Sequence, residues 1–275
     1  MKRNRRQSSL NGYLDFEVKH VEWARKKFKA ELRLFNRLSE AYGKGARLAY
    51  PQDKATGLCA ALFSDVHNDM LGTVSQMLRP RSGDASILMR HSIEAVAFAY
   101  ILSKQPDLYE VFLQSLPNRQ KLGEPYQFKR SKSFSRHFHV ARFFEGDTKS
   151  LCLLRVAYET ASAFHIHVNQ TILDRIRVGD DVDSNGYCEA HLPIVQVDEE
   201  DLPCQWYFFL LAYLEILIVF LGIPGLFKEG SELRGLTKRA VALIERVRVL
   251  FEAAKANQNQ SAKRPPPRYR NGQIS

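Results

Sequence analysis

The thirty residues 148–177 contain neither proline nor glycine and predict one long helix. At about 100° per residue, one narrow stripe of this helix is aliphatic at both ends and polar in the middle. The polar middle consists of Tyr158, Ser162, His165 and Asn169. Because a buried polar side chain costs free energy unless it is hydrogen-bonded, these groups should find partners on another helix. The stripe therefore predicts either a satisfied core network or a polar pocket.

A second helix, predicted over 84–103, is apolar on nearly all sides and should lie centrally in the fold. Arg90 and Glu94 lie four residues apart on one side of it. Since an unpaired buried charge is very costly, the two should pair with each other or reach a polar partner, and the stripe around Tyr158 is the obvious candidate. We expect helices 86–103 and 148–176 to cross in the core. A structural ion pair and a ligand or catalytic site remain alternative interpretations.

The whole pattern predicts an all-α protein, a single bundle of six to eight helices. A disordered basic arm is expected over 1–11, the bundle domain over 12–256 and a disordered, proline-rich basic tail over 257–275. His67 is expected on the surface. The remaining predicted elements are helices 14–42 (ended by Gly43 and Gly45), 53–78 (with Asp53 as N-cap), 107–116, 206–223 and 231–255, and a short strand over 191–197.

The formal net charge of +10 is concentrated at the two ends of the chain. Eight basic residues lie there, and the body between them is nearly neutral. Flexible basic arms of this kind suit contact with RNA, DNA or an anionic membrane, and they also serve simply to keep a protein soluble. The eight residues are Lys2, Arg3, Arg5, Arg6, Lys263, Arg264, Arg268 and Arg270.

Residues 126–146 alternate basic and aromatic side chains. This pattern suits phosphate contact combined with base stacking, and an amphipathic helix with a solvated basic face produces the same pattern. RNA or DNA is therefore the partner to consider for this segment. The candidate contact residues are Lys129, Arg130, Lys132, Arg136 and Arg142, and the interleaved aromatics are Phe128, Phe134, Phe138, Phe143 and Phe144.

Residues 206–223 form the most apolar segment, and their length is close to a membrane span. Glu215 is their only charge, and a charge at the bilayer centre costs about 2.5–3.5 kcal/mol on insertion scales. We therefore favour a core helix over a transmembrane span. The four scattered cysteines indicate reduced thiols in a cytoplasmic protein. The loop from Asp181 matches only the first half of a calcium loop, so we predict neither a metal nor a cofactor.

With these residues in view, the chain resembles a loose group of uncharacterised bacterial all-helical proteins. They carry an R-x-x-x-E helix, here Arg90 and Glu94, followed by a helix close to Y-x-x-x-S-x-x-x-H. This chain departs from that pattern because His165 lies three positions after Ser162, whereas the pattern has four. The group brings no established activity with it.

A weaker resemblance is to the HEPN helical ribonucleases, whose signature is an arginine and a histidine separated by four to six residues. Arg130 and His137 fit that spacing. The resemblance implies an RNA-cleaving site at a dimer interface, in which the histidine performs acid–base chemistry and the arginine stabilises phosphate charge.

Two function classes, and a third alternative, remain open at this point. The first is a non-catalytic binding or interaction module that contacts nucleic acid through its basic segments. The second is a hydrolase, most plausibly a ribonuclease, which uses either Arg130 and His137 or the cluster of Arg90, Glu94, Tyr158 and His165. A membrane-associated protein anchored through 206–223 is the third alternative.

Overall fold

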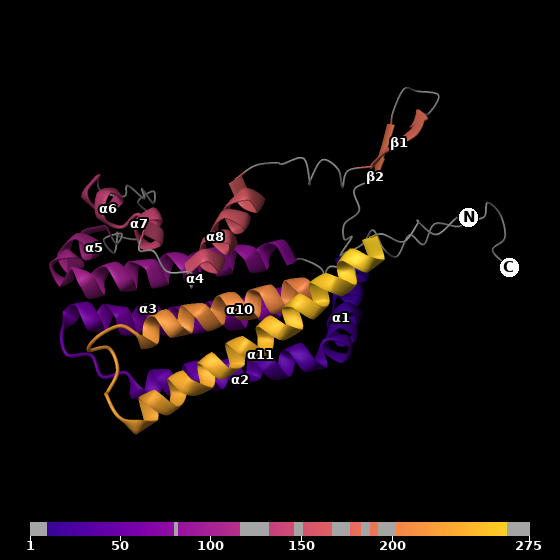
Figure 1. The fold of residues 1–275 in the computed structure, drawn as a ribbon. Coiled ribbons are helices and arrows are strands. Elements are labelled where there is room, and N and C mark those ends of the chain that lie inside the picture. The colour runs from indigo at the N-terminus through magenta and orange to yellow at the C-terminus, as the bar shows by residue number, and fades with distance from the viewer. Residues whose placement is uncertain are drawn as a thin grey trace.

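The computed structural model describes residues 10–79, 82–115, 132–145, 151–166, 177–182, 188–191 and 202–262. Within them the prediction of an all-α helical bundle is confirmed (Figure 1). Seven of the helices in these ranges have 16 residues or more, within the predicted six to eight, and the shorter helices come in addition. The predicted strand over 191–197 lies outside these ranges except for His191.

In the described ranges the helices follow one another along the chain, and one small two-stranded sheet lies between α8 and α10. The elements are α1 (Leu10–Lys27), α2 (Lys29–Leu48), α3 (Lys54–Met77), α4 (Ser82–Lys104), the 3-10 helix η2 (Pro106–Leu108), α5 (Tyr109–Ser115), α6 (Lys132–His137), α7 (Val140–Glu145), α8 (Leu151–Ile166), β1 (Arg177–Val182), β2 (Cys188–His191), α10 (Leu202–Leu221) and α11 (Ser231–Ala262).

Helix α10 is the centre of the bundle. It contacts α2, α3, α4, α8 and α11, and most of its side chains are buried, Trp206, Tyr213 and Phe220 completely. A helix that is apolar all round buries the most surface when helices surround it, which is why this segment lies inside. By length and composition alone, two of the helices in the described ranges, 84–104 and 203–221, are also apolar enough to cross a membrane.

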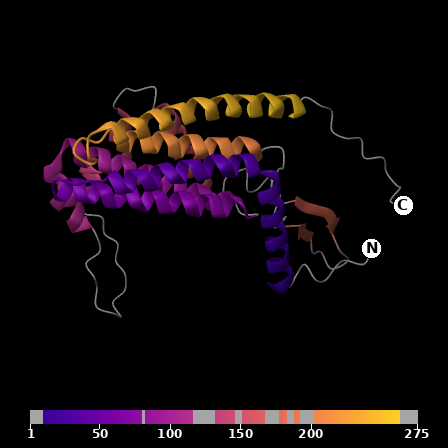
Figure 2. The same ribbon diagram turned by 90° about the horizontal axis from the view of Figure 1, so that it is seen from below.

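The predicted single helix over 14–42 is wrong in two respects. The chain bends at Phe28, whose backbone leaves helical geometry, and α1 crosses the end of the bundle while α2 runs along it (Figure 2). The ring of Phe28 is buried against Trp206 of α10, with 5.3 Å between centroids, and this contact fixes the bend. Gly43 and Gly45 do not end α2. A Cβ at Gly45 would lie 2.8 Å from the ring of Phe63, so this glycine permits close approach of α2 and α3.

The predicted boundaries of the two arms also need correction. Helix α1 begins at Leu10, inside the arm predicted over 1–11, and α11 continues to Ala262 rather than ending near residue 256. The end of α11 is rich in alanine and glutamine, which are good helix formers, and this explains the extension. The basic residues of both tails lie outside the described ranges.

The predicted N-cap of α3 is confirmed. The backbone N–H of Thr56 donates to Asp53 Oδ1 at 2.7 Å, and the N–H of Asp53 donates to Thr56 Oγ1 at 3.0 Å, so the two residues form a reciprocal capping box. The hydrogen bond from the N–H of Thr56, and then the one from the Thr56 hydroxyl, lower the pKa of Asp53. Two of the four orphan N–H groups of the helix start are thereby satisfied locally.

A polar network joins α3, α4 and α10. It begins in the extensive contact between α3 and α4 and ends on α10. Asp69 Oδ2 lies 2.6 Å from Nδ1 of His91 and accepts a hydrogen bond from Ser92 Oγ at 3.1 Å. Ser92 also reaches the hydroxyl of Tyr213 at 3.3 Å, and Thr73 lies 2.8 Å from that same hydroxyl. The network therefore runs from the half-exposed imidazole of His91 to a completely buried tyrosine.

His67 is not the surface residue that we expected. Its Nε2 lies 2.9 Å from Ser39 Oγ, and its ring stacks on Tyr42 with centroids 5.4 Å apart. Partial burial lowers the pKa of His67. The prediction failed because α2 covers the face of α3 that carries this histidine.

We expect the pair of His91 and Asp69 to make stability depend on pH. The hydrogen bond to Asp69 raises the pKa of His91. The contribution of this pair to the free energy of unfolding is therefore complete below about pH 6.5, and it is lost as the pH rises through the folded-state pKa of His91. Because the imidazole is half exposed, the effect should be about 0.5–1 kcal/mol. Urea unfolding of the wild type and His91→Gln at pH 5.5 and 8.5 measures it. Parallel pH profiles of the two proteins would contradict this assignment.

The predicted helix over 148–177 is confirmed only for α8, which ends at Ile166. Residues 148–150 and 167–176 lie outside the described ranges, and Arg177 already belongs to β1. This strand pairs antiparallel with β2 in the register Arg177 to His191 and Val182 to Cys188, and the resulting hairpin projects from the bundle (Figure 1). Glycine and aspartate at 179–181 disfavour a helix, while the flanking valines favour a strand.

Candidate functional site

The structure brings together three of the polar residues predicted to meet at α4 and α8. Arg90 Nε lies 3.2 Å from Glu94 Oε1, and the hydroxyl of Tyr158 donates to the same oxygen at 3.4 Å. The guanidinium of Arg90 also lies over the ring of Tyr158, 5.4 Å from its centroid. Burial, and then the nearby charge of Glu94, raise the pKa of Tyr158. These contacts support the structural ion pair and add an aromatic partner to it.

The rest of the predicted polar stripe is less complete. Ser162 Oγ is buried and has no hydrogen-bond partner within the described part of the chain. The side chain of His165 and all of Asn169 lie outside that part. Their membership of the network therefore stays a prediction.

A cavity of about 500 Å³ opens beside the Arg90 cluster, between α4, α7 and α8. Its polar wall includes Arg90, Glu94 and Tyr158 themselves. The other lining residues are Phe98, Phe138, His139, Val140, Ala141, Phe144, Glu145, Arg155 and Glu159. A cavity with an apolar wall and a few polar groups is the usual form of a small-molecule site.

The basic and aromatic segment folds differently from a base-stacking platform. Phe134, Phe138 and Phe143 are buried, and the first two pack edge-on against Phe98 of α4 with centroids 5.6 Å away. These rings belong to the core, so they are not available to stack on bases. The alternation of aromatic and basic residues here marks the amphipathic helices α6 and α7.

The cations of that segment are only partly visible in the structure. Arg136 and Arg142 are exposed on α6 and α7. Lys129, Arg130 and the side chain of Lys132 lie outside the described residues. His137 is half buried on α6, and since Arg130 is not described, the convergence of Arg130 and His137 on one face stays a prediction.

A basic groove lies between α2 and α11, and it was not predicted from the sequence. It has a volume of about 620 Å³, and five of its lining residues are basic while Glu40 is acidic. The apolar residues, among them Leu214 of α10 and Leu236, form its floor. We call this site the α2–α11 groove; its basic residues are Arg37, Lys44, Arg47, Arg239 and Arg246.

The charge of the groove arises from segregation within a nearly neutral body. Helix α2 carries five basic and two acidic residues, and α11 carries six basic and three acidic ones. None of the five groove cations has an acidic partner within 4 Å among the residues that the structure describes. Unpaired cations on two facing helices create a positive potential that suits an anionic partner.

No metal-binding cluster of three or more His, Cys, Asp or Glu side chains occurs in the described ranges. The chain also matches no protein-family model, no curated protein and no solved structure. What the protein does must therefore be inferred from its own residues.

Proposed function

We propose that this protein is a non-catalytic helical binding module that holds the phosphate backbone of RNA or DNA in the α2–α11 groove. The observation that carries the proposal is the set of five basic side chains along one groove that have no acidic partner among the described residues. Basic residues that neutralise phosphates release condensed counterions, and this supplies most of the affinity of sequence-independent nucleic-acid binding.

The spacing of the cations fits a linear polyanion. Arg37 and Lys44 are seven residues apart on α2, and Arg239 and Arg246 are seven apart on α11. Seven residues correspond to about 10 Å along a helix, so each pair points in roughly the same direction. The groove is thus lined by two basic rows, one on each side.

The lining of the groove contains no aromatic residue in the described part of the chain. Base stacking needs such a ring, whereas phosphate contact does not. The proposed mode is therefore backbone contact without sequence preference. The basic tails and the exposed Arg136 and Arg142 would add further phosphate contacts.

The same proposal places the protein in the cytoplasm and treats α10 as a core helix. The burial of most of α10 among five helices supports a core role over a membrane span. Free thiols at Cys59, Cys152 and Cys204 fit a reducing compartment.

Charge-matched variants of the full chain test the proposal. Replacing Arg37, Arg47, Arg239 and Arg246 by glutamine should weaken binding of a labelled RNA or DNA duplex at least about tenfold at physiological salt, because four phosphate contacts are lost. Fluorescence anisotropy measures the affinity, and gel analysis of the RNA should find it intact.

The control removes the same number of charges from the tail, through glutamine at Lys263, Arg264, Arg268 and Arg270. This variant should lose less affinity than the groove variant. If the groove variant binds as the wild type does, the groove is not the interface. Cleaved RNA would favour the ribonuclease alternative.

A further inference from the structure

We propose that the cavity between α4, α7 and α8 binds a small organic cation, an amine or quaternary ammonium that carries a ring or a short alkyl group. This site is separate from the α2–α11 groove and does not depend on the function proposed for it. Its volume of about 500 Å³ is in the range of ordinary small-molecule pockets.

The charges that line the cavity favour a cation over an anion. Among the described lining residues there are three glutamates and two arginines. Both arginines are already paired, Arg90 with Glu94 at 3.2 Å and Arg155 with Glu159 at 2.9 Å. Glu145 has no ion pair within the described part of the chain. An anion would have to break one of these ion pairs in order to bind an arginine, whereas a cation can bind the carboxylate of Glu145 without breaking a pair.

The aromatic wall provides the second recognition element. Phe144 and Tyr158 lie side by side with ring centroids 6.1 Å apart and planes inclined by 50°. The guanidinium of Arg90 lies 5.4 Å from the centroid of Tyr158, so this wall already contains one cation–π contact within the chain. The exposed Ala141 and the half-buried Phe144 offer apolar surface for the uncharged part of the ligand.

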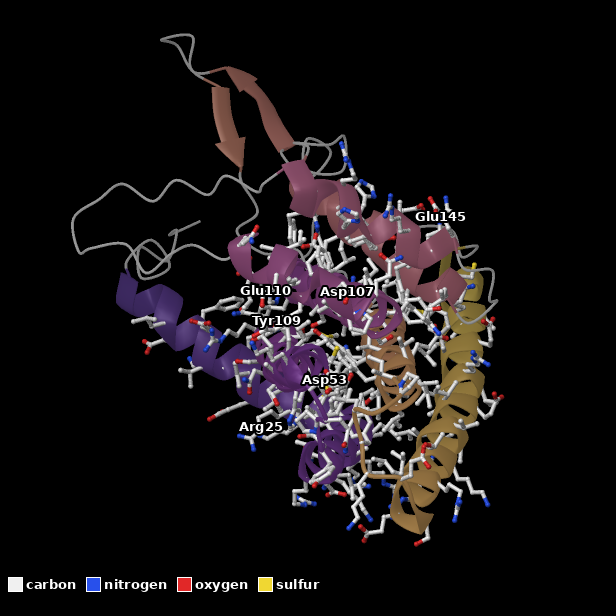
Figure 3. All side chains as sticks on the ribbon, turned by 90° about the vertical axis from the view of Figure 1, so that its left-hand side faces the viewer. Arg25, Asp53, Asp107, Tyr109, Glu110 and Glu145 are labelled. Carbon is white, nitrogen blue, oxygen red and sulfur yellow. The ribbon has the colours of Figure 1, made fainter. Side chains whose placement is uncertain are left out.

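The carboxylate and the rings lie on neighbouring elements. Glu145 ends α7 and stands at the outer edge of the molecule, far from the labelled Glu110 of α5 (Figure 3). Tyr158 lies on α8, which packs against α7. A ligand with its charge at Glu145 and its apolar part toward Phe144 and Tyr158 would use both elements.

Titration calorimetry of the full chain with benzyltrimethylammonium tests this inference, with benzoate and benzyl alcohol as the anionic and neutral probes of similar shape. The cation should bind at millimolar concentration or better, and the other two should bind more weakly. Glu145→Gln should weaken binding of the cation about three- to tenfold, since one charge contact is lost.

Glu110→Gln removes another exposed carboxylate, one that does not line the cavity, and should leave the affinity unchanged. Circular dichroism of each variant checks that its fold is intact. The inference is overturned if benzoate binds more tightly than the cation, if no binding of the cation is detected, or if Glu145→Gln and Glu110→Gln have equal affinities.

Discussion

Replacing Trp206 by alanine should lower the free energy of unfolding by about 3–5 kcal/mol, the largest effect that we expect from one substitution. Trp206 is completely buried, stacks on Phe28 at 5.3 Å and meets Phe35 edge-on at 5.7 Å between centroids. Alanine would leave a cavity where α1, α2 and α10 meet. Urea unfolding followed by circular dichroism measures the loss.

Trp206→Phe serves as the conservative comparison and should cost only about 1–2 kcal/mol. The indole Nε1 is buried and has no hydrogen-bond partner within the described residues, so phenylalanine sacrifices no hydrogen bond there. Trp23→Ala, at the half-buried tryptophan of α1, should also cost less than Trp206→Ala. If Trp206→Ala and Trp206→Phe lowered the free energy of unfolding equally, packing of an aromatic ring would not be what stabilises the contact between α1, α2 and α10.

The second large effect concerns Glu215, which should make the protein more stable at acidic than at neutral pH. Its Oε1 lies 3.3 Å from Arg248 Nη2, while Oε2 is buried without a partner in the described part. Burial raises the pKa of Glu215 from 4.5 to about 7 despite that arginine. The folded state thus binds the proton more tightly than the unfolded state, and stability falls as the pH rises from about 4.5 to about 7.

Glu215→Gln should remove about 2–3 kcal/mol of this pH dependence, because the amide does not ionise. Glu245→Gln is the matched control. Glu245 binds the same arginine at 3.2 Å but is exposed, so its loss should leave the pH profile unchanged. Unfolding measured at pH 4.5 and 8 compares the three proteins. A profile for Glu215→Gln that falls as steeply as that of the wild type would refute the assignment.

Much of the fold could be predicted because it depends on local patterns. Long, almost continuous apolar stretches located α4 and α10, the four-residue spacing predicted the pairing of Arg90 and Glu94, and Asp53 was recognisable as an N-cap. Each of these features involves residues within one or two helical turns. Tertiary contact is not needed to see them in the sequence.

The features that escaped prediction depend on contacts between distant segments. The bend at Phe28 is fixed by Trp206, and the continuation of α2 through Gly45 reflects packing on Phe63. The α2–α11 groove combines cations about 200 residues apart, such as Arg37 and Arg239, and the near-zero charge of the body concealed their segregation. The signal available in the sequence was the position of three basic residues on one face of α2, namely Arg37, Lys44 and Arg47.

The salt dependence of nucleic-acid affinity tests the central claim most directly. Each phosphate contact contributes a slope of about −0.7 to −0.9 to a plot of log affinity against log salt concentration, so removing four groove cations should make the slope shallower by about 3. The tail variant should change it less. If the slope of the groove variant equals that of the wild type while the tail variant loses its salt dependence, the tails bind nucleic acid and the α2–α11 groove does not.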